Sequence, residues 1–265
     1  MTAGAHVATE QRSLDTVLAL MPEARRAARA MLARVDRIAP LPPDALIVDV
    51  GASQGLFVTA CARLGYRAVG VEPWGAAREM AREVAAREGV AIEMVEGLAE
   101  RLPLASGSVD VVRANSVIEH VVDVESAFAE AFRVLKPGGV FWFSTASSLC
   151  PRQGEIRGFP AFGWYPDAVK LRVMAWAKEH RPELIGGTQF PAIHWFTPPK
   201  ARRLLERTGF SAIYDRWDLR LPSEGGCLYR LLLGTVRSSP LTKLAADVVV
   251  PTCSYAAVRA RLAGS

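Results

Sequence analysis

A glycine-containing turn and a carboxylate that follows it are the residues of this sequence with the clearest chemical purpose. The turn, Asp49-Val50-Gly51-Ala52-Ser53-Gln54-Gly55, lies between an apolar run and a stretch with helical spacing. Glycines in such a turn let the backbone bend sharply and approach a ligand closely. Glu72 stands 23 residues after Asp49, and its carboxylate can accept hydrogen bonds from both hydroxyls of a ribose. The two features predict a nucleoside site where two neighbouring strands end.

The same residues are also compatible with two other classes of protein, an oxidoreductase and a binding protein without catalysis. A dinucleotide-binding turn of the GxGxxG type needs glycines where Ser53 and Leu56 stand, so a cradle for pyrophosphate is disfavoured. A nicotinamide-dependent oxidoreductase stays an alternative, because Glu72 would serve the ribose of NAD equally well, although a Tyr-x-x-x-Lys hydride-site signature is absent. The other alternative is a binding protein that keeps the fold without catalysis.

The elements that must position these residues alternate between apolar runs and helical stretches. The expected strands are 45–50, 67–72, 91–95, 109–115 and 140–145. The expected helices between them are 56–64, 76–87 and a segment around Phe128 and Phe132 that stops at Lys136-Pro137-Gly138-Gly139. Strands alternating with helices at this spacing predict an α/β fold with a doubly wound parallel sheet.

Changes in composition and in the spacing of apolar residues divide the chain into four segments. Residues 1–43 form an N-terminal helical segment that we expect to cover the cofactor site, with a break near Pro22, and 44–146 form the cofactor-binding core. Residues 147–196 hold eight of the 21 aromatic residues, which predicts a lid or substrate insertion. Residues 197–265 complete the core, with a helix at 199–208, a strand near 210–217, an apolar helical insertion at 224–248 and a closing edge strand at 253–260.

Five motifs in order resemble the class I S-adenosylmethionine (SAM) methyltransferases, in particular the broad family that includes the ubiquinone-biosynthesis methyltransferases. They are the acid-x-G-x-G-x-G turn with Ser53 as its middle residue, VEGLAERLP, VDVVRANSVIEHVVD, RVLKPGGVFWFST and HWFTPPKARRLLERTGF. The resemblance runs from about Ile47 to Phe210. It implies a Rossmann-like sheet of seven strands, mostly parallel with an antiparallel last strand, and helices on both faces. It also implies SAM as cofactor, S-adenosylhomocysteine as product, and no metal.

The resemblance assigns a part of the cofactor to each site residue. It implies that Asp49, Gly51, Ser53 and Gly55 hold the methionine part, that Glu72 binds the ribose, that the backbone N–H of Ala99 meets the adenine edge, and that the carbonyl of Asn115 lies near the methionine amine. Trp74 either stacks on adenine or packs in the core. Leu98 stands where the family usually has Asp, so either Glu96 or Glu100 replaces that contact, or the affinity for SAM is reduced.

Two histidines are candidates for the chemical step. Methyl transfer from a sulfonium depends on alignment, and it needs a base only when the acceptor atom is protonated at neutral pH. His194 ends the aromatic insertion and is the first candidate base, the alternative being a packing or capping role. His120 follows Glu119 near the methionine end and is the second candidate, the alternative being a structural histidine at the rim.

Composition limits the partners. The chain carries a net charge of +5, but its basic residues are interspersed with acids, as in AREMAREVAARE, which indicates solvated helix faces rather than a nucleic-acid site. Four widely spaced cysteines, no secretory signal and no apolar run of about 18 residues predict a cytoplasmic protein without a zinc site or a transmembrane segment. The aromatic insertion favours a small acceptor with a large apolar or aromatic body, methylated on O or N.

The apolar stretch 227–250 leaves the state of association open. It lacks a clear basic face, so peripheral membrane contact is the less favoured reading, and packing against the sheet or a second subunit is preferred. The sequence is compatible with a monomer or a homodimer.

Overall fold

Seven strands form one sheet in the order β3-β2-β1-β4-β5-β7-β6 in the computed structural model, which describes residues 13–152, 154–185 and 190–260. The strands are β1 (Leu46–Val50), β2 (Arg67–Val71), β3 (Glu93–Val95), β4 (Val109–Asn115), β5 (Leu135–Ala146), β6 (Phe210–Asp215) and β7 (Thr252–Arg259). The pairs among β1 to β5 are parallel, and β7 is antiparallel to both β5 and β6. The predicted sheet of seven strands with an antiparallel last strand is confirmed.

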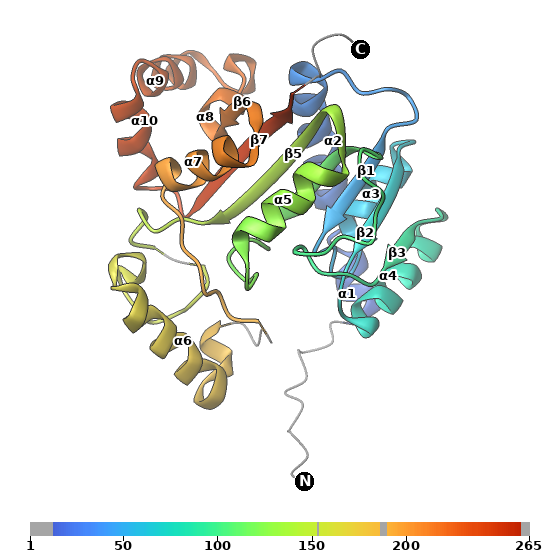
Figure 1. Cartoon of the computed structure of the whole chain (residues 1–265), viewed down its shortest axis with the longest axis horizontal. Coiled ribbons are helices and arrows are strands. Elements are labelled where there is room, and N and C mark those ends of the chain that lie inside the picture. Colours follow the sequence, from blue (N-terminus) through green and yellow to red (C-terminus); the bar gives the residue numbers. More distant parts are fainter. Residues whose placement is uncertain (1–12, 153, 186–189, 261–265) are drawn as a thin grey trace.

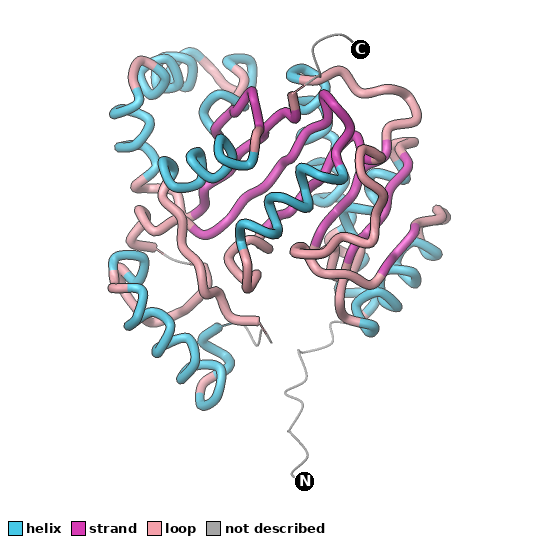
Figure 2. The backbone as a smooth tube through the Cα atoms, viewed as in Figure 1, coloured by secondary structure: helices cyan, strands magenta, loops and turns pink. Residues whose placement is uncertain are grey.

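Helices cover both faces of the sheet (Figures 1 and 2). One face carries α1 (Leu14–Leu18), α2 (Met21–Ile38), α3 (Leu56–Arg63), α4 (Gly75–Arg87) and α8 (Arg216–Leu219). The other carries α5 (Val124–Val134) and α7 (Pro198–Thr208), whose buried residues share a core with the phenylalanines of β5. Successive residues of β1 pack on opposite faces of the sheet, since Val48 belongs to the core that contains α5 and Ile47 to the core that contains α2.

Local signals place several helix ends. The predicted break near Pro22 is present, because α1 ends at Leu18 and α2 begins at Met21 with the proline in its first turn. Thr197 caps α7 by accepting a hydrogen bond from the Lys200 N–H, and Gly209 ends it in a left-handed conformation with φ of 105°.

Two predictions about the strands are wrong, the start of β5 and the place of the last strand in the sheet. β5 begins at Leu135, directly after α5, and not after the Lys-Pro-Gly-Gly segment. Its pairing with β4 shifts from Val109↔Leu135 to Val111↔Val140, so a bulge absorbs that segment. The strand expected to close the sheet as an edge lies inside it, because β7 pairs with β5 on one side and β6 on the other. The edge strand is β6.

Residues 147–196, which are predicted to form a lid and which we call the lid, have a small core of their own among their described residues. The lid contains α6 (Asp167–His180) and two 3₁₀ turns, Phe162–Trp164 and Pro182–Ile185. Phe162, Met174 and Trp195 are buried there, and the cluster reaches the sheet at Ala146. The two stems of the lid meet where the Phe196 N–H donates to the Ala146 carbonyl (3.0 Å) and the Ser148 N–H to the Phe196 carbonyl (2.9 Å). The remaining elements are a 3₁₀ turn, Pro222–Glu224, and the helices α9 (Cys227–Arg237) and α10 (Pro240–Asp247) between β6 and β7.

Candidate active site

The glycine turn follows β1 and has the backbone that a close ligand approach requires. Gly51, Ser53 and Gly55 all adopt positive φ angles, of 68°, 48° and 70°. A Cβ added to Gly51 would lie 2.5 Å from Cγ2 of Val117, and one added to Gly55 would lie 2.5 Å from Cβ of Ala81. Both glycines are therefore required by conformation and by space, whereas Ser53 takes the left-handed conformation at an energetic cost.

Glu72 lies beside this turn at the end of β2. Its side chain is buried, and its two carboxylate oxygens accept hydrogen bonds from the backbone N–H groups of Ser53 (2.8 Å) and Trp74 (3.2 Å). Burial raises the pKa of Glu72, and these two N–H donors oppose the increase. Each oxygen keeps a second lone pair, so the carboxylate is held in place and can still accept from the hydroxyls of a ribose.

Asp49 is turned away from the solvent and toward an arginine that the sequence analysis did not single out. Asp49 is only 3% exposed and pairs with the guanidinium of Arg113, on the neighbouring strand β4. That guanidinium lies 4.1 Å from the ring centre of Phe57, at the start of α3. Burial raises the pKa of Asp49 and Arg113 opposes this effect. The pair fixes β1, β4 and α3 beneath the turn, and the expected role of Asp49 in holding methionine stays a prediction.

The residues expected around adenine come from the loops after β2 and β3. Trp74 is 38% exposed, and its ring lies 5.5 Å from that of Phe190, which belongs to the lid. Leu98 is 53% exposed and Ala99 is buried in the loop after β3. The two carboxylates that could replace the missing aspartate have other partners, Glu96 with Arg78 (2.6 Å) and Glu100 with the Val122 N–H (2.8 Å).

Asn115 ends β4, and the chain turns sharply after it. Its side-chain oxygen accepts a hydrogen bond from the Ser144 hydroxyl, and Ser116 follows with a positive φ of 55°. Because β3, β2, β1 and β4 are adjacent in the sheet, the structure brings all nine predicted cofactor residues to one edge, at or just after the carboxyl ends of these strands. We call residues 49–55, 72–74, 96–100 and 113–116 the nucleoside side.

The predicted bases lie across from it, between the end of β4 and the lid. The Nδ1 atom of His120 and the Nε2 atom of His194 are both buried, and neither has a hydrogen-bond partner among the residues that the structure describes. Burial lowers the pKa of His120, and hydrogen bonding to the backbone of Pro191 and Phe190 opposes the decrease. The His194 N–H and the Ile193 N–H both donate to the carbonyl of Glu119, at 3.1 and 2.8 Å. The lid is therefore attached to the core at Glu119.

Glu119 and Glu155 are the acidic groups of this region that the sequence analysis missed. Glu119 is 2% exposed, and its Oε2 accepts a hydrogen bond from the hydroxyl of Thr145 (3.0 Å), near the end of β5. Burial raises its pKa to about 7, and the nearby carboxylate of Glu155, from the lid, adds to the increase. The Oε2 atom of Glu155 is buried and has no partner within the described residues. We call Glu119, His120, Thr145 and the lid the lid side.

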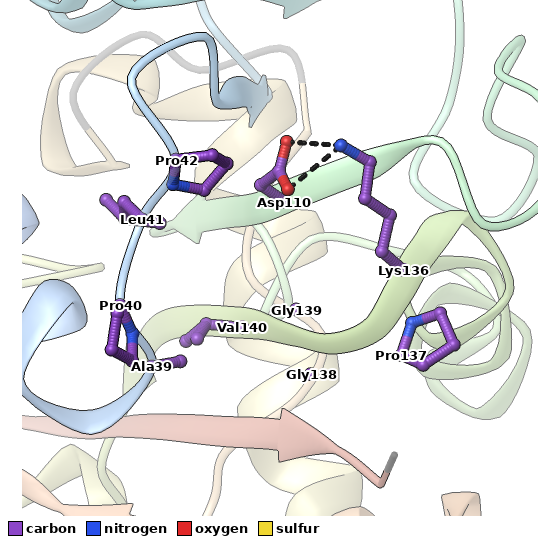
Figure 3. A pocket seen from close by; sticks show the side chains of 10 residues that line it. All are labelled: Ala39, Pro40, Leu41, Pro42, Asp110, Lys136, Pro137, Gly138, Gly139 and Val140. Carbon is purple, nitrogen blue, oxygen red and sulfur yellow. Dashed lines mark hydrogen bonds and ion pairs between the residues drawn. The ribbon is translucent and has the colours of Figure 1, made fainter. Parts of the chain in front are cut away.

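A separate cleft of about 170 Å³ opens at the opposite edge of the sheet (Figure 3). Its lining includes Asp110, whose carboxylate accepts hydrogen bonds from Lys136 (2.8 and 2.9 Å) and from the Leu46 N–H (2.8 Å). These contacts join the amino ends of β1, β4 and β5 to one another, at the edge where open α/β sheets do not bind their ligands. No group of three or more metal-ligating side chains occurs in the described part of the chain.

The comparison with protein families agrees with this geometry. A family model described as Methyltransferase domain matches residues 48–143, which include the glycine turn, Glu72, Asn115 and Glu119. An uncharacterized methyltransferase of Mycobacterium sp. (strain JLS) is 39% identical over 117 residues, which cover 44% of this chain and 45% of that protein.

Two further relatives carry more specific names. The ubiquinone biosynthesis O-methyltransferase of Methylobacterium nodulans is 36% identical over 107 residues, covering 40% of this chain and 43% of that protein. The chain thus matches less than half the length of these curated relatives. The solved structure of Haemonchus contortus phosphoethanolamine N-methyltransferase 2, in complex with S-adenosyl-L-methionine, superimposes with a TM-score of 0.55 at 16% identity, covering 87% of this chain and 52% of that one. At this identity the likeness concerns the fold.

Proposed function

From the premise that this chain carries a class I, SAM-dependent methyltransferase domain, we propose that it transfers a methyl group from SAM to a hydroxyl or amine of a small, largely apolar or aromatic acceptor. The observation that carries the proposal is the combination of the glycine turn and Glu72. The turn has no room for a Cβ at Gly51 or Gly55, and the buried carboxylate beside it keeps acceptor lone pairs for a ribose.

The residues present fit this cofactor. Gly51, Ser53 and Gly55 give the turn at the end of β1 three positive φ angles, as a turn around a methionine moiety would have, and Glu72 is held by two backbone N–H groups. The bound cofactor supplies a methyl group on a positively charged sulfur, which makes that methyl group reactive toward a nucleophile. The protein's own contribution is to align the acceptor with it and to exclude water, and such alignment can lower a barrier by roughly 7–11 kcal/mol.

The lid supports an apolar or aromatic acceptor. Phe162 and Trp195 fill its own core, but Phe190 is 47% exposed and its ring lies 5.5 Å from that of Trp74 on the nucleoside side. The name of the Methylobacterium nodulans relative favours a hydroxyl group as the acceptor atom of this chain. A hydroxyl is protonated at neutral pH, so its methylation calls for a base.

We propose His194 as that base, with His120 and Glu119 as the other candidates. His194 has a buried ring nitrogen without a partner in the described part of the chain, as expected for a group that awaits a substrate proton. The pKa of Glu119, about 7, also suits a group that exchanges a proton near neutral pH. In this role the base would accept the proton of the acceptor hydroxyl, while the cofactor, held by the glycine turn and Glu72, would supply the methyl group and leave as S-adenosylhomocysteine.

Calorimetric titration of SAM tests the cofactor site. The Glu72→Ala variant should lose SAM and S-adenosylhomocysteine binding by at least about 100-fold, since it removes a charged hydrogen-bond acceptor and leaves the Ser53 and Trp74 N–H groups unpaired. The control is Glu206→Ala, which removes a carboxylate on α7 that is 51% exposed and pairs with Arg202. Binding of NADH by the wild type in place of SAM would overturn the proposed function.

Replacing His194 tests the chemical step. With an acceptor found by screening with radiolabelled SAM, His194→Ala should lower turnover by about 10²-fold or more and leave the Kd of SAM unchanged. His180→Ala is the control, because that side chain is 56% exposed on α6. If turnover is unchanged, His120→Ala and Glu119→Gln decide between the remaining candidates.

A further inference from the structure

The helical hairpin formed by α9 and α10 exposes a band of large apolar side chains. On α9, Leu228, Leu231 and Leu232 are 70%, 67% and 56% exposed. Leu241 on α10 is 77% exposed, and Val249 just after it is 78% exposed. Only Leu233 is buried on α9, and no residue is buried on α10. The sequence analysis preferred packing against the sheet or a second subunit, and the structure does not show the band packed against the sheet. Exposed apolar patches of this kind mark surfaces that contact something else.

The hairpin is attached to the protein through its polar side chains. The guanidinium of Arg237 donates to the backbone carbonyls of Trp217, Asp218 and Arg220, at 2.6 to 3.1 Å. On α10, Lys243 donates to Asp215 and Asp218, and Asp247 accepts from the indole N–H of Trp217. A surface helix ordinarily faces the protein with its apolar side and the solvent with its charged side. The hairpin has the opposite orientation, so its leucines would become buried only against an apolar environment outside the chain.

The charge around the band is positive. Residues 220–250, which contain the hairpin, hold four Lys and Arg against two Asp and Glu, a net charge of +2. Both signs take part in internal contacts, since Lys243 binds Asp215 and Asp218, Arg34 binds Glu224 at 2.6 Å, and Arg237 donates to backbone carbonyls. Arg220, directly after α8, and Arg230, on α9 between Leu228 and Leu231, are exposed. An anionic surface complements this arrangement.

We propose that the α9–α10 hairpin docks on an anionic lipid bilayer. Its leucines would enter the boundary between headgroups and acyl chains while Arg220 and Arg230 contact the headgroups. A second copy of the chain fits this surface less well, because a two-fold contact would bring the same basic patch of both copies together. The docking is peripheral: no helix among the described residues is long and apolar enough to span a membrane. Figure 1 shows α9 and α10 on the outside of the molecule, at the β6 end of the sheet.

Co-sedimentation of the full chain with vesicles tests the proposal. We expect the wild type to pellet with vesicles of phosphatidylcholine and phosphatidylglycerol, and to stay in the supernatant with vesicles of phosphatidylcholine alone. The triple variant Leu228→Ser, Leu231→Ser and Leu241→Ser should partition at least about tenfold less, since it removes three apolar side chains from the contact. Arg230→Gln should weaken binding to a smaller extent and reduce its dependence on salt.

The control is Val122→Ser, which alters an apolar side chain that is 84% exposed outside the hairpin and should leave partitioning unchanged. Circular dichroism and thermal unfolding show whether each variant is folded, as expected for changes at exposed positions. Wild-type protein that stays in the supernatant with the anionic vesicles overturns the proposal. So does a wild-type dimer that the triple variant converts to a monomer, measured by light scattering, because the band is then covered by a second copy.

Discussion

The nucleoside side and the lid side differ in the partners of their buried charged and polar groups. On the nucleoside side, buried Asp49 is balanced by Arg113, and buried Glu72 is held by two backbone N–H groups. On the lid side, buried Glu119 has a hydroxyl and a second carboxylate as its neighbours, and ring nitrogens of His120 and His194 have no partner in the described residues. The first region therefore has partners within the chain for its buried charges, whereas the second contains buried polar atoms that have no partner in the described residues. This difference fits the proposed function, in which the first region holds the cofactor and the second meets the acceptor.

Removing the balancing charge on the nucleoside side should have the largest effect on stability. Arg113→Met leaves the Asp49 carboxylate buried without its partner, which should lower the free energy of unfolding by about 3–5 kcal/mol. Urea unfolding at neutral pH measures the change. The control is Arg202→Met, which breaks the ion pair between Arg202 and Glu206. Both side chains are about half exposed, so this variant should lower the free energy of unfolding by less than about 1 kcal/mol. Equal losses in the two variants would show that the buried pair contributes no more to stability than the exposed pair.

Glu119 on the lid side should instead make stability depend on pH. Its pKa is raised to about 7 in the folded protein, from about 4.3 in the unfolded chain, so folding favours the neutral carboxyl. The stabilisation is complete below about pH 4 and is lost as the pH rises through about 7, with a total on the order of 3 kcal/mol.

Glu119→Gln should remove most of this dependence, because glutamine stays neutral. Thermal unfolding at pH 5 and pH 8 measures the difference between the two pH values for each protein. Glu96→Gln, which changes a carboxylate that is 74% exposed, should behave like the wild type. A variant at position 119 with an unchanged pH dependence would contradict the assignment of the buried carboxyl.

The smallest effect is expected at the one strained position of the glycine turn. Ser53→Gly relieves a left-handed conformation with φ of 48° but makes the unfolded chain more flexible. The two effects nearly offset, so we expect a gain in stability of no more than about 1 kcal/mol and no loss of SAM affinity. Gln54→Gly, which adds flexibility without relieving a positive φ, should lower stability. A marked loss of SAM affinity in Ser53→Gly would indicate that the serine hydroxyl contacts the cofactor.

The parts predicted from the sequence depend on residues that are close together in the chain. The glycine turn, Glu72 and the strands that carry them could be found because the spacing of apolar residues and glycines is a local signal. The position of β7 could not be found in this way. A strand of apolar residues has the same pattern at an edge and in the interior, and its neighbours are decided by the packing of the whole sheet.

The lid side was predicted least completely for the same reason. His194 and His120 attract attention as isolated histidines, but Glu119 and Glu155 are ordinary acidic residues in the sequence. They gain their properties when the lid folds over the end of β4 and removes both carboxylates from water. A signal was present in the Glu119-His120 dipeptide that follows the end of β4, where open α/β sheets place their functional groups.

The position of β7 also bears on how the chain reaches its native state on the ribosome. β6 pairs in the sheet with β7 alone, and β7 separates it from β5. One edge of β5 (residues 135–146) therefore stays unpaired while more than a hundred further residues are synthesised. Only then can residues 252–259 pair with it. An unpaired edge strand is a template for wrong pairing between chains. We expect nascent chains that end before β7 to depend on chaperones and to aggregate when released.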